Sequence, residues 1–108
     1  MDFDVRVERA PAGATLVRVE GDLDLATTPL VRDALADAPS GARVVLDLSA
    51  CTFLDSSAVQ LFATAARDAE QAGGSLAVVA PDPAVARVLE ITRMDTILEV
   101  HRSLETAL

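Results

Sequence analysis

The chain of 108 residues contains no lysine, tryptophan or tyrosine and only three phenylalanines. The absence of lysine excludes the phosphate-loop motif and Schiff-base chemistry, because both depend on a lysine amine. Hydrophobic residues still make up 51% of the sequence, so the core has to be built mainly from Val, Leu, Ile and Ala. A chain of this length is typical of one domain with one core. We therefore expect residues 1–108 to form a single domain.

Cysteine and histidine occur once each, as Cys51 and His101. A lone cysteine cannot form an internal disulfide, which fits a reducing compartment. A nucleophilic thiol needs a base, and a lone histidine far along the sequence offers no recognisable catalytic pair. One histidine is also no metal site. We expect Cys51 to be a small buried side chain, and the protein to use no metal or other cofactor.

Positive charge is scarce, with nine basic residues against 17 acidic ones and a net charge of -8. Nucleic-acid binding depends on clustered cations, so this balance argues against a nucleic-acid partner, and equally against an anionic membrane. It favours a basic protein surface as the partner. The sequence shows no signal-peptide pattern and no apolar run long enough to span a membrane. These features predict a cytoplasmic protein.

Hydrophobic periodicity predicts a hairpin followed by alternating strands and helices. Residues 3–8 and 15–20 alternate between apolar and polar side chains around a turn at 11–13. Residues 44–48 begin with the apolar run Val-Val-Leu, which is typical of a strand buried on both faces. The remaining elements follow from helical spacing and turn signals, namely a helix capped by Thr28 with Leu30, Ala34, Leu35 and Ala38 on its buried face, a helix from Ser57 to Ala72, a strand at 76–80, a helix from Asp82, a strand at 96–100 and a helix at 103–108. This order predicts an α/β fold with a mixed β-sheet, made of an N-terminal hairpin plus parallel crossovers and packed with about four helices.

The residues after the central strand, Phe-Leu-Asp-Ser-Ser at 53–57, open a helix with hydroxyl groups. Asp55, Ser56 and Ser57 are each favoured helix caps worth about 1 kcal/mol, and Ser57 with Gln60 fits a capping box. A phosphate on such a hydroxyl would also be accommodated by the free N–H groups and the helix dipole. Helix capping and regulated phosphorylation are both open here. Nucleophilic catalysis by Ser57 is not expected, since no catalytic base or Gly-x-Ser-x-Gly elbow accompanies it.

The acidic turn at Asp22 and Asp24 allows two interpretations. An Asp-x-Asp after a strand resembles the Mg²⁺ site of haloacid-dehalogenase-type phosphotransferases. Those enzymes carry Thr or Val where this chain has Ala26, and they need a lysine that this sequence lacks. A Mg²⁺-dependent phosphatase is thus one alternative function. The other interpretation is an acidic rim beside the Asp-Ser-Ser loop that faces an arginine-bearing partner.

Taken together, three motifs resemble the STAS domain of bacterial anti-sigma factor antagonists over nearly the whole chain. They are the Gly-Asp-Leu-Asp turn at 21–24, the strand at 45–49 running into Phe-Leu-Asp-Ser-Ser at 53–57, and Gly-Gly-Ser-Leu at 73–76 followed by residues 81–89. The resemblance implies the STAS fold and a non-enzymatic regulator. It further implies that Ser57 is phosphorylated by an anti-sigma factor that is also a serine kinase. The unphosphorylated protein would bind that kinase and release a sigma factor, and a PP2C-type phosphatase would reverse the phosphorylation.

The same resemblance implies a partner surface around the Asp-Ser-Ser loop, made of Asp55, Ser56, Ser57, Ala58, Gln60, Asp22 and Asp24. The family usually has glycine where this chain has Ala58, and the extra methyl is expected to crowd a partner packed close to the backbone. An alternative within the family is a STAS subunit of a lipid-transport ATP-binding cassette complex, which would dock through the same loop without phosphorylation. Weak pairing of two copies through the exposed hairpin edge also stays open.

Overall fold

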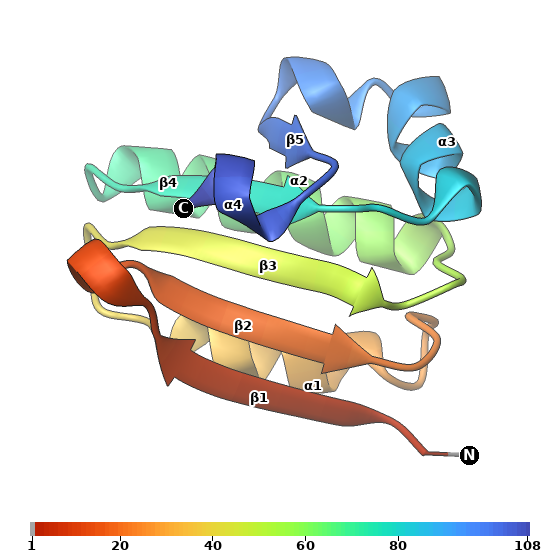
Figure 1. Ribbon diagram of the computed structural model, residues 1–108, viewed down its shortest axis with the longest axis horizontal. Coiled ribbons are helices and arrows are strands. Elements are labelled where there is room, and N and C mark those ends of the chain that lie inside the picture. The colour runs from red at the N-terminus through yellow and green to blue at the C-terminus, as the bar shows by residue number, and fades with distance from the viewer. Residues whose placement is uncertain (1) are drawn as a thin grey trace.

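The computed structural model describes residues 2–108 as a five-stranded sheet with helices on both sides (Figure 1). The strands follow one another across the sheet in chain order, and only the first pair is antiparallel. The elements are β1 (Asp4–Arg9), η1 (Pro11–Gly13), β2 (Thr15–Glu20), α1 (Thr28–Ala36), β3 (Arg43–Ala50), α2 (Ser56–Gln71), β4 (Ser75–Val79), α3 (Pro83–Ile91), η2 (Met94–Thr96), β5 (Glu99–His101) and α4 (Leu104–Ala107). The mixed sheet with an N-terminal hairpin and parallel crossovers is confirmed.

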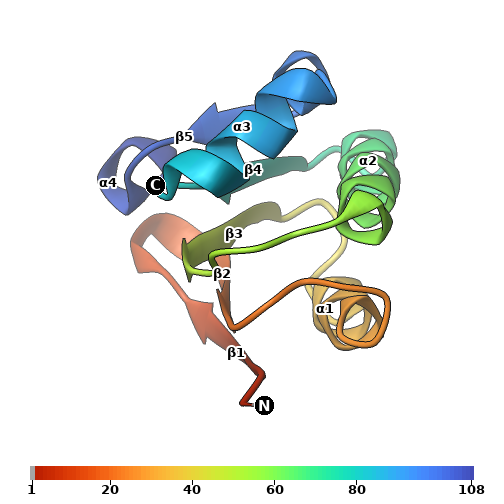
Figure 2. The ribbon, with the colours of Figure 1, turned by 90° about the vertical axis from the view of Figure 1, so that its right-hand side faces the viewer.

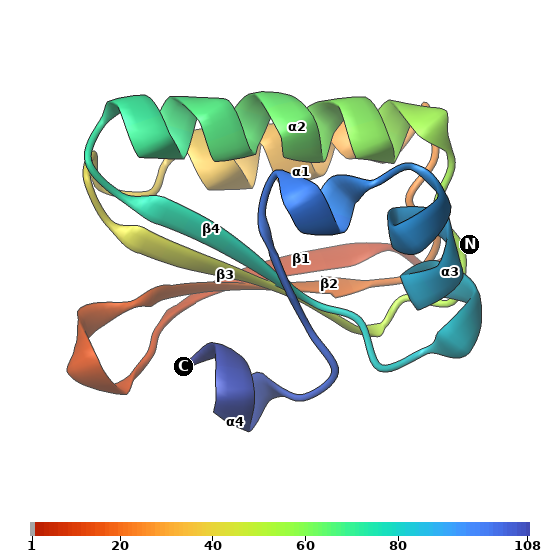
Figure 3. The same cartoon turned by 90° about the horizontal axis from the view of Figure 1, so that it is seen from above.

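The two faces of the sheet are covered unequally. Helices α1 and α2 lie side by side on one face, and the short α4 lies on the other (Figure 3). Since successive side chains of a strand point to opposite faces, β3 serves both layers. Val44, Leu46 and Leu48 join the larger core under the long helices, whereas Val45 joins a smaller core with Leu16 and Ala107. Burial of β3 on both faces, expected from its apolar run, is confirmed.

Two sequence-based element assignments need correction. The last strand is Glu99–His101, because Met94–Thr96 forms a 3-10 turn in which Met94 is buried. The N-cap position of α1 is Thr27, one residue earlier than expected, and its side chain makes no capping hydrogen bond to the helix. The buried residues of α1 are Thr28 and Val31, while Leu30 is 53% exposed. Helical spacing alone allowed either Leu30 or Val31 on the buried face. The packing of α1 against the sheet buries Val31.

None of the helices in residues 2–108 is both long and apolar enough to cross a membrane.

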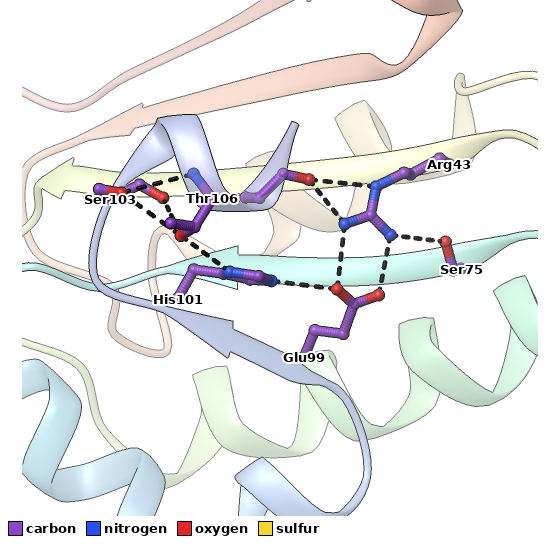
Figure 4. A network of polar contacts seen from close by, with 7 residues as sticks. Arg43, Ser75, Glu99, His101, Ser103 and Thr106 are labelled. Carbon is purple, nitrogen blue, oxygen red and sulfur yellow. Dashed lines mark hydrogen bonds and ion pairs between the residues drawn. The ribbon is translucent and has the colours of Figure 1, made fainter.

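A polar network ties the C-terminal helix to the sheet (Figure 4). The guanidinium of Arg43 donates to both carboxylate oxygens of Glu99, with Nη1–Oε2 at 2.8 Å and Nη2–Oε1 at 3.1 Å. The same guanidinium donates to the carbonyl oxygen of Ala107 at 2.6 Å, near the end of α4. His101 contacts Glu99 through Nε2 and Thr106 through Nδ1. Arg43 therefore ties both β5 and α4 to β3, and His101 joins β5 to α4 directly.

Replacement of Glu99 by glutamine is expected to remove a pH-dependent part of the stability. Hydrogen bonds from Arg43 and then His101 lower the pKa of Glu99 from 4.5 to about 2. Because the side chain of Glu99 is 48% exposed, solvent screening limits its contribution to about 1 kcal/mol. The folded-state pKa lies below the unfolded one, so this contribution is complete above pH 4.5 and is lost as the pH falls through about 2. Urea unfolding at pH 7 and at low pH measures it.

The difference between wild type and Glu99→Gln should accordingly be largest at pH 7 and shrink at low pH. Glu105→Gln is the matched control, because Glu105 is exposed on α4 and makes no hydrogen bond or ion pair within residues 2–108. Equal pH profiles for the two variants would contradict the role of the Arg43–Glu99 pair.

Candidate functional site

The Asp-Ser-Ser loop and the acidic turn lie side by side where the parallel strands end. The chain leaves β2 and β3 at the same edge of the sheet, which faces the viewer in Figure 2 (Figure 2). The backbone N–H of Leu23 donates to the carbonyl oxygen of Phe53 at 3.0 Å, and that of Asp55 donates to Leu23 at 3.1 Å. These bonds extend the β2–β3 pairing by one bridge, between Leu23 and Leu54. The two motifs, about 30 residues apart in sequence, therefore form one surface.

Asp55, rather than Ser57, is the cap of α2. Its backbone is extended, with φ of -114°, and its Oδ1 accepts hydrogen bonds from the N–H groups of Ser57 at 2.9 Å and Ala58 at 3.4 Å. The helix begins at Ser56, so Ser57 is its second residue. The capping box expected between Ser57 and Gln60 is not formed, because Asp55 already accepts the N–H groups that a cap serves.

The hydroxyl of Ser57 is held by the same carboxylate. Its Oγ donates to Asp55 Oδ1 at 2.5 Å. This bond is the main cause of a lowered pKa of Asp55, with further lowering from the backbone N–H groups of Ser57, Ala58 and Leu25. Asp55 is thus an ionised carboxylate at neutral pH, and a lowered pKa makes it a poor proton acceptor. The arrangement orients a hydroxyl group for an incoming reagent but supplies no strong base of its own.

The acidic turn uses one of its carboxylates internally. Asp24 Oδ1 accepts from the N–H groups of Ala26 at 3.0 Å and Thr27 at 3.1 Å. The hydroxyl of Thr27 donates to the carbonyl oxygen of Asp22 at 2.7 Å and closes the turn before α1. Asp24 is therefore occupied in holding the loop, whereas Asp22 is half-buried beside it. Within residues 2–108 no three His, Cys, Asp or Glu side chains gather as a metal site would require.

The expected partner residues differ in accessibility. Ser56 and Gln60 are exposed, and Asp55 and Ser57 are half-buried. Ala58 is fully buried in the larger core under α2. Its methyl group packs inward, so the expectation that it crowds a partner is not met.

Two apolar side chains on this surface were not anticipated from the sequence. Leu25 is 77% exposed and Phe53 is 50% exposed, although both belong to residue types that usually pack inside. They flank the Asp55–Ser57 pair, since Leu25 donates its N–H toward the Asp55 carboxylate and Phe53 lies two residues before it. Periodicity gave no signal for either, because both follow strands in short loops without a regular repeat.

Cys51 has a structural role at the end of β3. Its thiol is fully buried and donates to the carbonyl oxygen of Phe53 at 3.1 Å. Burial is the main cause that raises the pKa of this thiol. A protonated, buried thiol is a poor nucleophile. The expectation of a small buried side chain is confirmed, and the cysteine helps shape the loop that carries Phe53.

Comparisons with known proteins agree on the fold and the family. A family model described as "Mlab, STAS domain" matches residues 7–99. The crystal structure of an anti-sigma factor antagonist from Mycobacterium paratuberculosis is similar at 30% identity, with a TM-score of 0.85 over 98% of this chain and 91% of that chain. An antisigma-factor antagonist STAS domain from Rhodobacter sphaeroides is 31% identical, with a TM-score of 0.53 over 71% of this chain and 85% of that chain. The Bacillus cell fate determinant SpoIIAA, solved in a phosphorylated form, shares the fold at 18% identity, with a TM-score of 0.70 over 95% of this chain and 96% of that chain.

Proposed function

The chain belongs to the STAS domain family, and from this premise we propose that it is an anti-sigma factor antagonist switched by phosphorylation of Ser57. Its five-stranded mixed sheet with flanking helices is the STAS fold, as the sequence motifs predicted. The observation that carries the proposal is the half-exposed Ser57 hydroxyl, which Asp55 holds at the start of α2 on a surface built from two joined loops.

In the proposed unphosphorylated state, the loops offer a binding surface to an anti-sigma factor that is also a serine kinase. Leu25 and Phe53 supply exposed apolar area, and the buried centre of a protein interface is more apolar than its rim. Asp22, Ser56 and Gln60 supply polar groups around them. Since the chain has a net charge of -8, the fitting partner surface is basic. Binding of this partner would release the sigma factor that it holds.

Phosphorylation changes this surface in two ways. The phosphate adds about -1.5 to -2 charges at neutral pH. Ser57 Oγ also loses the proton that it donates to Asp55, so an attraction at 2.5 Å is replaced by repulsion between two anions. The start of α2 favours negative charge through its dipole, so the fold tolerates the modification. An interface that fits the unmodified hydroxyl does not tolerate the added charge and bulk of the phosphate, and it dissociates.

The proposal assigns no catalytic residue to this chain. Transfer of a phosphoryl group to Ser57 would be catalysed by the kinase, and its removal by a PP2C-type phosphatase. The ring of His101 contacts Glu99 and Thr106 on β5 and α4, so it does not serve Ser57 as a base. The protein would act in the cytoplasm as a regulator of transcription, without a cofactor.

Affinity capture from the native cell lysate tests the proposed function. One bait is the unmodified protein and the other carries phosphoserine at position 57, with bound proteins identified by mass spectrometry. We expect an ATPase-fold serine kinase on the unmodified bait alone. A transport cassette protein on both baits would replace the proposal with the lipid-transport alternative, and turnover of a phosphate ester that depends on Mg²⁺ would replace it with the phosphatase alternative.

A further inference from the structure

We propose that Arg32 receives the phosphate of phosphorylated Ser57 across the groove between α1 and α2. This inference rests on the proposed phosphorylation of Ser57 and deepens it, since it names a second residue of this chain that responds to the modification.

The groove brings the two residues together. It has a volume of about 630 Å³ and runs between the helices, with Ser57, Gln60 and Thr64 on its α2 side and Thr28 and Arg32 on its α1 side. The apolar part of its lining includes Leu35 and Leu61. Among the described residues that line it, Arg32 is the one cationic side chain. A dianion at Ser57 therefore has a single nearby cation within this groove.

The geometry of the helices puts the guanidinium of Arg32 within reach. Both helices start at the edge where the parallel strands end, so Thr28 and Ser57 lie at the same end of the groove. Arg32 is about one turn, or roughly 6 Å, further along, and packed helix axes lie about 8–10 Å apart. Because the long side chain of arginine carries its guanidinium well away from the backbone, it can meet a phosphate on Ser57 across that diagonal. The Cα–Cβ bonds of a helix also tilt toward its N-terminus, so the Arg32 side chain leaves the backbone in the direction of the end where Ser57 lies.

Arg32 has no strong competing partner within residues 2–108. Its recorded ion pair is with the adjacent Asp33 at 3.7 Å, and the two side chains are 64% and 74% exposed. Exposed pairs of this length contribute little. Asp68, the acidic residue of the groove, lies on α2 about three turns beyond Ser57. It is therefore favourable for the Arg32 guanidinium to leave its ion pair with Asp33 and bind the phosphate, because a guanidinium can bind a phosphate through two parallel hydrogen bonds.

The carboxylate of Asp55 selects the direction in which the phosphate turns. Asp55 sits 2.5 Å from Ser57 Oγ, so a phosphate at that oxygen is repelled from the Asp55 side. Turning toward the groove moves it away from one anion and toward the cation of Arg32. The phosphate then bridges α1 and α2 at the end of the groove. Phosphorylation in this way both adds negative charge and withdraws a positive charge from the surface.

Phosphorus NMR titration of protein with phosphoserine incorporated at position 57 during translation tests this pairing without any cognate kinase. An adjacent guanidinium lowers the second pKa of the phosphate, so we expect Arg32→Gln to raise it by about 0.5–1 unit. Arg32→Lys should restore most of that difference. Arg67→Gln is the matched control, because Arg67 is an exposed arginine of α2 outside the residues that line the groove. High salt should reduce the effect of Arg32→Gln.

Equal phosphate titrations for wild type, Arg32→Gln and Arg67→Gln would overturn the proposed pairing. The result of this titration is independent of the result of the affinity capture that tests the proposed function. If the phosphorylated bait still captures the kinase, the switch fails, while the titration still decides whether Arg32 contacts the phosphate.

Discussion

Replacement of Ser57 by aspartate is expected to weaken binding of the anti-sigma partner about 100-fold, which is about 2.8 kcal/mol. The substitution puts a permanent negative charge next to Asp55, where the Ser57 hydroxyl now donates a hydrogen bond. In the complex this charge would be buried without a counter-ion, which is costly. In the free protein it lies at the second position of α2, where the helix dipole stabilises it and offsets its repulsion from Asp55. The melting temperature should therefore change by no more than about 4 °C.

Isothermal titration calorimetry with the captured partner measures the affinity, and calorimetric unfolding measures the stability. Gln71→Glu is the matched control, because it adds the same charge to the exposed C-terminal end of the same helix, roughly 21 Å away. Ser57→Ala removes the hydroxyl without adding charge, and since Asp55 is the cap, it should leave both binding and stability nearly unchanged. Unaltered affinity of Ser57→Asp would show that the switch does not act at this position.

Replacement of Gly74 by alanine is expected to destabilise the protein by about 3 kcal/mol, with a fall in melting temperature of about 15 °C. An added Cβ would lie 2.2 Å from the carbonyl oxygen of Ala42 and 2.9 Å from the carbonyl carbon of Gly41. Both are backbone atoms of the segment that leads into β3. That segment cannot move aside easily, because Ala42 accepts a hydrogen bond from Ser75 at 3.3 Å and β3 pairs with β4 immediately beyond.

Comparison with a Gly73→Ala variant distinguishes a steric clash from backbone strain. The φ of Gly73 is +84°, in the left-handed region, but an added Cβ would meet no atom within 4 Å. Gly73→Ala should thus cost about 1–2 kcal/mol, which is the ordinary cost of that conformation for alanine. Thermal and urea unfolding of the two variants measures the difference. If Gly73→Ala lowers the free energy of unfolding at least as much as Gly74→Ala, the close approach of Gly74 to Ala42 is not the reason that alanine is disfavoured at position 74.

The candidate site shows where local sequence rules stop. Asp55, Ser56 and Ser57 are all good caps, and propensity could not choose among them. The choice depended on where β3 ends and on the bond from Asp55 N–H to Leu23, a residue of another loop. The same bond places Asp55 so that its carboxylate accepts both from the helix and from the Ser57 hydroxyl. The residues of the motif were evident in the sequence. Which of them caps the helix and which presents its hydroxyl was not.

The burial of several residues differs from what the sequence predicted, for a similar reason. Leu30 and Val31 are equally apolar neighbours, yet Val31 is buried and Leu30 is exposed. Ala58 was expected to form part of the partner surface and lies in the core, while Leu25 and Phe53 lie at the surface. In each case the burial depends on how a helix or loop is oriented on the sheet. This orientation cannot be predicted from a short window of neighbouring residues.

By itself the sequence determined the fold class, the order of strands and helices, and the Asp-Ser-Ser and Gly-Asp-Leu-Asp motifs. These follow from short-range periodicity, turn residues and charge, which a linear pattern records directly. Only the tertiary structure decided that Asp55 caps α2, that the two loops share one surface with Leu25 and Phe53, and that Arg32 shares a groove with Ser57. The physical reason is that these arrangements depend on pairs of residues about 25–32 positions apart, such as Leu23 with Asp55 and Arg32 with Ser57. Such pairs meet only once parallel strands and their crossover helices have been packed side by side.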